Sequence, residues 1–391
     1  MHLALLCANE SIATSLVSHG ADINALHADG SRLLHRAILR SDKFAAQFLI
    51  NANADVNVLT ASNQSPLHLA AEKCLEDTAV MLLRHRAIIN PRNSEGNTPL
   101  QTSIINANAA MVTLFLASDG VDINCRNNAG HTPLWLALSL SDSQFARTLV
   151  SRGCDINVIS SDGNTMLHHA LDIPNEKTAM FLVENGARLF ITNTAGKTPL
   201  HIAVSKGLLA VTALLLEKGA SVNARDALMK TPLMYAVQNV HAGVIRILIA
   251  RGGLDVDAQD ADSCCALEMA LNAENLELAQ VLVENQANLN LVNNGDNLLH
   301  SAILKGKKAS VKFLLKNGAA MEALSKSGMT PLQLAVTKQD ADMVAELCNY
   351  NAAPNVTDSS GYAPLWHALN SRQDRVIELL GWCSLNEATV I

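Results

Sequence analysis

Aromatic residues are scarce in this sequence, and their scarcity argues against a conventional globular core. Phenylalanine, tyrosine and tryptophan make up only 3% of the 391 residues, although hydrophobic residues make up 49%. Alanine and leucine supply most of the apolar content, which suits short and closely packed helices. We therefore expect an all-α fold built from short helices.

Charge blocks and long apolar runs are also missing. The net charge of −7 is spread along the chain, so nothing indicates that the protein binds nucleic acid. No apolar run approaches the ~20 residues that a membrane-spanning helix needs, and we expect no direct membrane insertion. The start of the chain has neither the basic residues nor the cleavage site of a secretory signal, so we expect a cytoplasmic protein.

The eight cysteines form no Cys-x-x-Cys pair, and only Cys264 and Cys265 are adjacent. Scattered single cysteines in a long chain are typical of reduced thiols that act as small hydrophobic residues. We therefore predict that all eight are free thiols. Without Cys-x-x-Cys pairs, the sequence gives no support for a zinc site.

An internal repeat determines the predicted fold. A leucine that follows Thr-Pro, or a related pair, recurs at intervals of 32 to 34 residues over eleven copies. A partial twelfth copy opens the chain at His2. We expect each marker leucine to be buried at the start of a first helix. The marker leucines are Leu34, Leu67, Leu100, Leu134, Leu167, Leu200, Leu233, Leu267, Leu299, Leu332 and Leu365.

Each copy has the residues that begin and end two short helices. The Thr198 hydroxyl can cap a first helix, and Pro199 suits the first helical position because no backbone donor is needed there. A second apolar helix ends at a Gly-Ala pair such as Gly219-Ala220, where glycine permits a left-handed C-cap. A turn glycine stands four residues before most marker leucines, as Gly196 does, and we expect it to be exposed at positive φ.

These residues are those of the ankyrin repeat, and the chain is identified as a member of the ankyrin-repeat family over nearly its whole length. The resemblance implies about twelve helix-turn-helix units with hairpin tips, stacked into a curved solenoid. It also implies that the tips and first helices line a concave face that binds other proteins. We expect residues 1–391 to form a single array, with a partial first repeat and a last repeat that is degenerate from about residue 381.

Several repeats depart from the pattern. Neither end has a polar capping repeat, which a solenoid needs for solubility, so we expect the chain to be part of a longer protein. Met229 and Ser263 replace the turn glycine in consecutive repeats. The stretch from about Leu228 to Ser263 is then either neutral drift in a robust scaffold or a hinge or specialised surface.

The order of unusual variants is similar to the ankyrin region of the endosomal ankyrin–FYVE family. Examples are the His168-His169 pair and the His241-Ala242-Gly243 run. The resemblance implies early-endosome traffic, fluid uptake and binding of a Rab-family small GTPase, with placement on the endosome through BTB and FYVE domains that this sequence does not contain. The alternative is an ankyrin adaptor of another system, such as cytoskeletal anchoring or ubiquitin-ligase substrate recruitment.

The sequence gives little support for a catalytic site or a metal site. Six of the thirteen histidines share one repeat position, and we predict that each bonds the backbone of the adjoining turn through a ring nitrogen. The sequence has no glycine-rich phosphate loop and no Gly-x-Ser-x-Gly elbow. We therefore expect no enzyme activity, no cofactor and no metal. The six histidines are His2, His35, His68, His168, His201 and His300.

Partner-binding candidates come from the hairpin tips and the solvent side of the first helices, because these places do not build the stack. Exposed apolar groups there are either unimportant surface residues or part of a contact patch. The tryptophans that replace the repeat histidine either anchor a partner or pack between neighbouring repeats. The candidates are Arg126, His131, Trp135, Leu228, Lys230, Lys326, Met329, Lys338, Tyr362 and Trp366.

Overall fold

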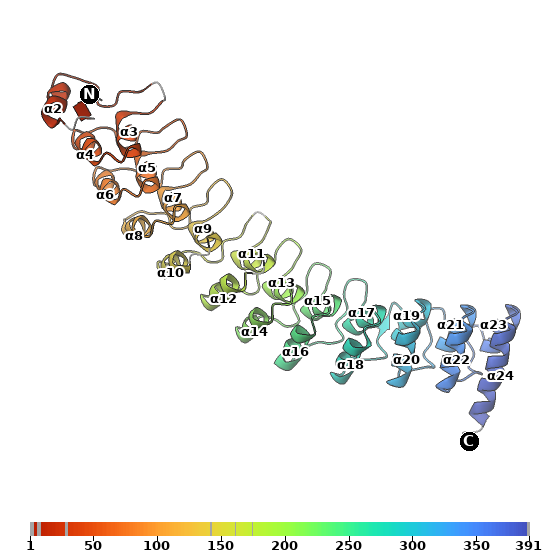
Figure 1. Ribbon diagram of the computed structural model, residues 1–391. Helices are drawn as coiled ribbons and strands as arrows, with labels where there is room; N and C mark the ends of the chain where they lie inside the picture. Colours follow the sequence, from red (N-terminus) through yellow and green to blue (C-terminus); the bar gives the residue numbers. More distant parts are fainter. Residues whose placement is uncertain are drawn as a thin grey trace. The chain divides into compact units, whose positions relative to one another are not determined.

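The fold is built from pairs of short antiparallel helices joined by hairpin loops (Figure 1). This computed structural model describes residues 4–5, 9–27, 30–140, 143–160, 162–173 and 175–388. They divide into two compact units, residues 1–160 with 185–187 and residues 161–184 with 188–391. Each unit is an all-α repeat solenoid, as the sequence predicts.

The first unit stacks four first helices and five second helices among its described residues. The first helices are α3 (Leu33–Leu39), α5 (Pro66–Glu72), α7 (Pro99–Ile105) and α9 (Pro133–Ser139). The second helices are α2 (Glu10–Ser18), α4 (Lys43–Asn51), α6 (Glu76–Arg84), α8 (Ala109–Ala117) and α10 (Ser143–Ser151). Within this unit each first helix packs on the next first helix, and from α4 onward each second helix packs on the next second helix.

The second unit repeats the same arrangement. Its first helices are α11 (Met166–Asp172), α13 (Pro199–Ser205), α15 (Pro232–Gln238), α17 (Ala266–Asn272), α19 (Leu298–Leu304), α21 (Pro331–Thr337) and α23 (Pro364–Asn370). Its second helices are α12 (Glu176–Glu184), α14 (Leu209–Glu217), α16 (Ala242–Arg251), α18 (Leu276–Glu284), α20 (Lys308–Lys316), α22 (Ala341–Asn349) and α24 (Asp374–Ala388). One hairpin is regular enough to form the antiparallel strands β1 (Val292–Asn293) and β2 (Asp296–Asn297).

The Thr-Pro-Leu signal acts as predicted at the start of the first helices. The Thr98 hydroxyl accepts from the Gln101 backbone N–H at 3.4 Å, and Pro99 occupies the first helical turn. The marker leucines from Leu34 to Leu332 are buried, whereas Leu365 is 43% exposed. The prediction that every marker leucine is buried is therefore wrong at Leu365, because α23 is the last first helix and no further first helix covers it among the described residues.

Left-handed residues end the helices and form the turns. The predicted C-cap residues Gly20, Gly186, Gly219 and Gly318 all have positive φ, and so do their replacements Asn53, Arg86, Gln286 and Asn351. The turn glycines also have positive φ, but only Gly130, Gly295 and Gly361 are exposed as expected; the expectation is wrong at Gly30, Gly163, Gly196 and Gly328, which are half-buried, and at Gly96, which is buried. The next hairpin packs closely on it, so that a Cβ at Gly96 would lie 2.3 Å from the Asn128 Oδ1.

A recurring asparagine just after the second helix links one repeat to the next. In the first unit, Asn90 accepts from the Asp122 backbone N–H at 2.9 Å and donates to the Gly120 carbonyl at 2.8 Å. In the second unit, Asn223 makes the same two bonds to Asp255 and Gly253. These amides thus satisfy the backbone just after the second helix of the following repeat.

Candidate protein-binding surface

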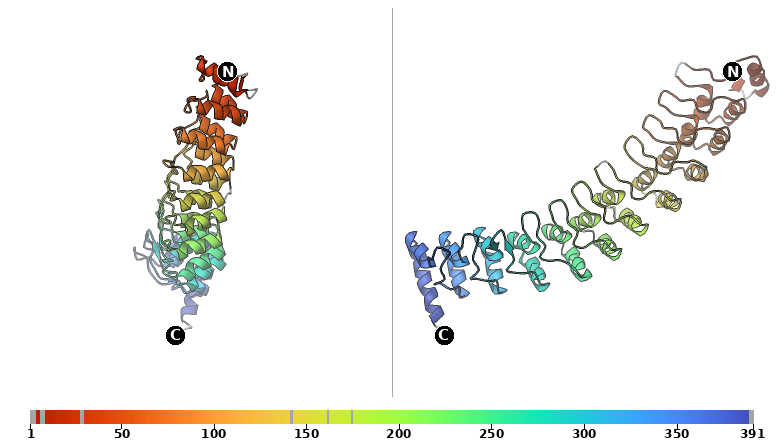
Figure 2. Two further views of the ribbon diagram at one scale, coloured as in Figure 1. Left: turned by 90° about the vertical axis from the view of Figure 1, so that its left-hand side faces the viewer. Right: turned by 180° about the vertical axis from the view of Figure 1, so that it is seen from behind.

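The hairpin surface, by which we mean the hairpin turns together with the exposed side of the first helices, is continuous within each unit. Backbone bonds join neighbouring tips, as from the Asn128 N–H to the Glu95 carbonyl at 3.0 Å and from the Ala227 N–H to the Ala195 carbonyl at 3.1 Å. Figure 2 shows the loops of each unit projecting side by side, beside the first helices. Side chains on successive hairpins can therefore act together.

The repeat histidines connect the hairpins to the first helices. His68 Nε2 bonds the Asn97 carbonyl oxygen at 2.8 Å, and His201 Nε2 bonds the Lys230 carbonyl oxygen at 3.1 Å. Their predicted role is confirmed at His35, His68, His168, His201 and His300, while His2 lies outside the described residues. Burial lowers the pKa of each of these five side chains, so they are neutral structural groups.

The two tryptophans that replace the repeat histidine each stack on an aromatic residue of their own hairpin. In the first unit the rings of Trp135 and His131 lie 3.3 Å apart and 4° from parallel. In the second unit Trp366 and Tyr362 lie 3.9 Å apart at 18°. Trp366 is 43% exposed and Tyr362 is 41% exposed, so this pair presents a flat aromatic surface to solvent.

Lys230 lies in a cluster that the sequence did not reveal. Its ammonium group is 6.0 Å from the centre of the Tyr235 ring, and the Lys197 ammonium of the preceding hairpin is 4.5 Å from the same ring. The Tyr235 hydroxyl donates to the buried Asp226 carboxylate at 2.6 Å. The shared repeat position of Lys197 and Lys230, the residue before the capping threonine, was the signal that could have found this cluster.

The remaining candidates are more scattered. Arg126 and Lys326 are exposed, as is Leu228 at the tip beside Lys230. Met329 was expected on an exposed tip but is half-buried, and its carbonyl accepts from His300. Lys338 is the C-cap of α21 and therefore lies at the turn into α22, away from the hairpin tip.

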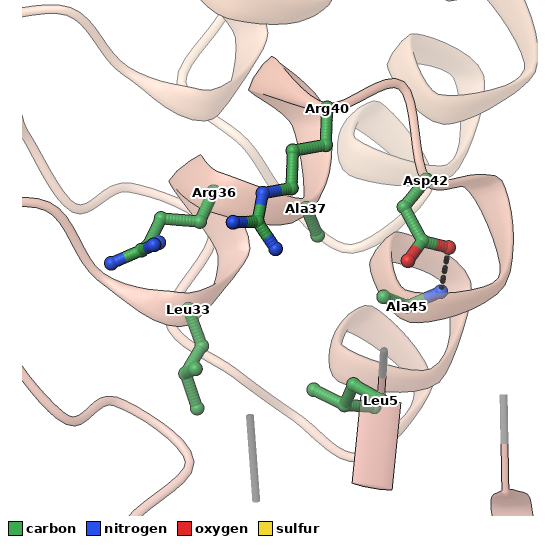
Figure 3. A pocket seen from close by; sticks show the side chains of 7 residues that line it. All are labelled: Leu5, Leu33, Arg36, Ala37, Arg40, Asp42 and Ala45. Carbon is green, nitrogen blue, oxygen red and sulfur yellow. Dashed lines mark hydrogen bonds between the residues drawn. The ribbon is translucent and has the colours of Figure 1, made fainter. Parts of the chain in front are cut away.

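Two hollows lie in the first unit. A cavity of about 20 Å³ beside Arg36 and Arg40 in the first unit (Figure 3) has room for about one water molecule. A larger hollow of about 510 Å³ lies between α2 and α4, lined in part by Phe44 and Phe48. Among the residues that the structure describes, no group of three or more His, Cys, Asp or Glu side chains could hold a metal ion.

Burial makes several of the cysteines unreactive in this fold. The seven described ones are free thiols, as predicted, and Cys7 lies outside the described residues. Burial raises the pKa of Cys264 to about 12 and that of Cys154 and Cys265 to about 11. These thiols therefore remain protonated at neutral pH and are poor nucleophiles.

The family assignment rests on a direct comparison. The family model for ankyrin repeats, which contains three copies, matches residues 1–93, 82–160, 142–226, 224–293 and 299–386. The chain belongs to the ankyrin-repeat family. Ankyrin repeats mediate binding to other proteins, and the family and its fold are typically non-catalytic interaction modules. No helix in the described part of this array is long and apolar enough to cross a membrane.

Several ankyrin proteins are similar to parts of the array. Rabankyrin-5 of Mus musculus is 33% identical over 137 residues, which cover 32% of this chain and 12% of that protein. This match confirms the predicted resemblance to Rabankyrin, the endosomal ankyrin–FYVE protein. The neurogenic locus notch homolog protein 1 of Danio rerio is 32% identical over 142 residues, covering 36% of this chain and 6% of that protein.

A solved structure supports the fold. The crystal structure of the ankyrin repeat domain of Bcl-3, a member of the IkappaB protein family, is 31% identical and aligns with a TM-score of 0.53. The alignment covers 56% of this chain and 99% of the Bcl-3 domain. The repeat stack is thus shared with a domain that is about half as long.

Proposed function

We propose that this ankyrin array is the protein-binding scaffold of an endosomal trafficking protein and that its hairpin surface binds a Rab-family small GTPase. The similarity to Rabankyrin-5 over 137 residues supports the endosomal assignment. Residues 1–391 act as a single array in this proposal. The array contributes binding rather than catalysis, and it is carried to the cytoplasmic surface of early endosomes by other domains.

The observation that supports the hairpin surface is its supply of exposed aromatic, apolar and cationic side chains. Tyr362, Trp366 and Leu228 are each more than 40% exposed, and cations such as Lys326 lie on the same side of the second unit. Exposed aromatic and apolar groups beside cations are typical of protein contact surfaces. Such groups could serve as the anchors that carry most of the binding energy.

The second-helix side differs in its charge arrangement. Lys308 pairs with Asp342 at 2.9 Å and Lys312 pairs with Glu346 at 3.5 Å, in each case from α20 to α22. These cations already have carboxylate partners within the stack. We therefore place the partner on the hairpin surface rather than on the second helices.

The test is a pull-down of a panel of Rab-family GTPases, loaded with GDP or a non-hydrolysable GTP analogue, on the immobilised chain. We expect one nucleotide form of at least one GTPase to be retained. Combined substitution of Lys326→Glu, Met329→Ala and Tyr362→Ala should weaken this binding by at least about tenfold, as the loss of anchor residues does. Circular dichroism should show an unchanged helix content.

The matched control places the same kinds of change on the second-helix side, with Lys312→Glu, Lys316→Glu and Tyr350→Ala. Binding should survive in this variant. If binding is lost in the control variant but kept in the hairpin variant, the partner binds the second-helix side and the proposed surface is wrong. An alternative result is that the chain retains a cytoskeletal protein or a ubiquitin-ligase substrate and binds no GTPase in either nucleotide form. That result would show that the array is a scaffold of another system and would overturn the endosomal assignment.

A further inference from the structure

The hairpins that precede α13 and α15 bring two lysines to one aromatic ring. Lys197 and Lys230 occupy the same position in consecutive repeats, directly before the capping threonine. Their ammonium groups lie 4.5 Å and 6.0 Å from the centre of the Tyr235 ring. The ring thus positions two like charges from neighbouring hairpins on one small area of the surface.

Both lysines are fixed by their backbones rather than by their side chains. The Lys197 carbonyl accepts from His168 Nε2 and the Lys230 carbonyl from His201 Nε2, each at 3.1 Å. Burial lowers the pKa of His201, whose ring meets Tyr235 edge-on at 5.9 Å. The imidazole is therefore neutral at pH 7, and it adds no third positive charge to the cluster.

The carboxylate bonded to Tyr235 is already occupied. Asp226 is buried, and its oxygens accept from the Leu228 and Lys230 backbone N–H groups at 2.9 Å and from the Tyr235 hydroxyl at 2.6 Å. Among the described residues, no carboxylate lies within salt-bridge distance of either ammonium. The cluster therefore carries two cations without a salt bridge to a described carboxylate, and the Asp226 carboxylate that accepts from Tyr235 is engaged in holding the turn.

Apolar groups border the cations. Leu228 is 57% exposed and Met229 is 44% exposed at the tip of the second hairpin. Both are held there by a turn in which Met229 has a φ of 59°. A ligand that suits this arrangement has an acidic side chain next to an apolar one.

We propose that the Lys197–Tyr235–Lys230 cluster binds a partner-protein segment in which a glutamate or aspartate is followed by an apolar residue. The carboxylate bridges the two ammonium groups above the ring, and the apolar side chain rests on Leu228 and Met229. This inference rests on the proposed use of the hairpin surface, and it names the chemistry of the segment that the surface accepts.

The probe for this site is a fluorescein-labelled peptide of alternating glutamate and leucine, compared with its glutamine–leucine counterpart by fluorescence anisotropy on the whole chain. The glutamate peptide should bind at least about tenfold more tightly, a difference of about 1.4 kcal/mol. Its binding should weaken as salt is raised, because the ammonium groups are accessible to ions. The double variant Lys197→Gln, Lys230→Gln should lose the preference.

The control variant Lys308→Gln, Lys312→Gln removes two cations from the second-helix side and should bind both peptides as the parent chain does. Equal binding of the two peptides to the parent chain, or equal loss in the control variant, would overturn the proposal. Tighter binding of inorganic phosphate than of the glutamate peptide would show that the cluster binds a phosphate group instead. A homodimer of the parent chain that dissociates in the Lys197→Gln, Lys230→Gln variant would show that the cluster binds a second copy of the chain. GTPase retention without any peptide preference would leave the proposed function intact and reject this site alone.

Discussion

The repeat position that usually carries histidine shows what a single side chain must do in this stack. His68 bonds the Asn97 carbonyl oxygen of the next hairpin, and Gln101 does the same work one repeat later by donating to the His131 carbonyl at 2.9 Å. Gln333 repeats it with the Tyr362 carbonyl at 2.8 Å. Both side chains supply a buried N–H donor of a suitable length, although the position does not demand one, because Met234 is buried there in α15 and Trp135 and Trp366 stack on their own hairpins.

Two replacements of His68 should distinguish the contribution of its hydrogen bond to stability from the contribution of its ring packing. His68→Ala removes the partner of a buried carbonyl and should lower the free energy of unfolding by about 1–3 kcal/mol. His68→Gln should recover most of that loss, because glutamine already works at Gln101. Urea unfolding of the three chains measures the difference. An equal loss in the two variants would show that ring packing, rather than the hydrogen bond, is what the position needs.

The same histidines should make the fold sensitive to acid. Burial lowers their pKa in the folded chain, whereas the unfolded side chains have a pKa of about 6.5. As the pH falls below about 6.5, the unfolded chain takes up protons that the folded chain does not, so the free energy of unfolding decreases. Urea midpoints between about pH 7.5 and pH 5.5 should fall, and less steeply in the double variant His68→Gln, His201→Gln. A slope that is unchanged in the double variant would contradict this account.

At the scale of the helix pair, the tight turn between the two helices requires one left-handed residue. Gly207 and Gly306 supply it without strain, but Val240 adopts a φ of 58° at the same place. A β-branched residue is strained in this region. This position cannot be predicted from the sequence, because the residue there varies from repeat to repeat and no single residue type marks it.

Val240→Gly should stabilise the protein by about 0.5–1 kcal/mol, since relief of strain exceeds the added freedom of the unfolded chain. Val240 is 56% exposed, so little buried area is lost. The reverse change, Gly306→Val, meets nothing within 4 Å and serves as the matched control that should destabilise. Thermal unfolding followed by calorimetry measures the melting temperature of both variants. A lower melting temperature for Val240→Gly would show that the valine side chain contributes more than its conformation costs.

At the scale of the whole molecule, the sequence specified what lies within a repeat better than what lies between repeats. Period, caps and left-handed C-caps follow from local patterns such as Thr198-Pro199, and the structure has them. The Asn90 bonds to the next repeat and the Lys197–Tyr235 contact depend on how neighbouring hairpins align, and a pattern within one repeat does not show this alignment, which only a comparison of positions between repeats could indicate. The exposure of Leu365 has the same origin, because burial of a marker leucine requires the following repeat.

A core truncation should test whether stability in the second unit is shared only between neighbours. Leu200 is fully buried in α13, and Leu200→Ala should cost about 2–5 kcal/mol, as other core truncations do. Because α13 packs on α11, α14 and α15, coupling between neighbouring repeats should confine the effect. Amide hydrogen exchange should accelerate most in these helices, while α19 to α22 keep their protection. Uniform loss of protection through α22 would instead mean that the unit unfolds as one cooperative block, and the description of the stack as a chain of neighbour contacts would be wrong.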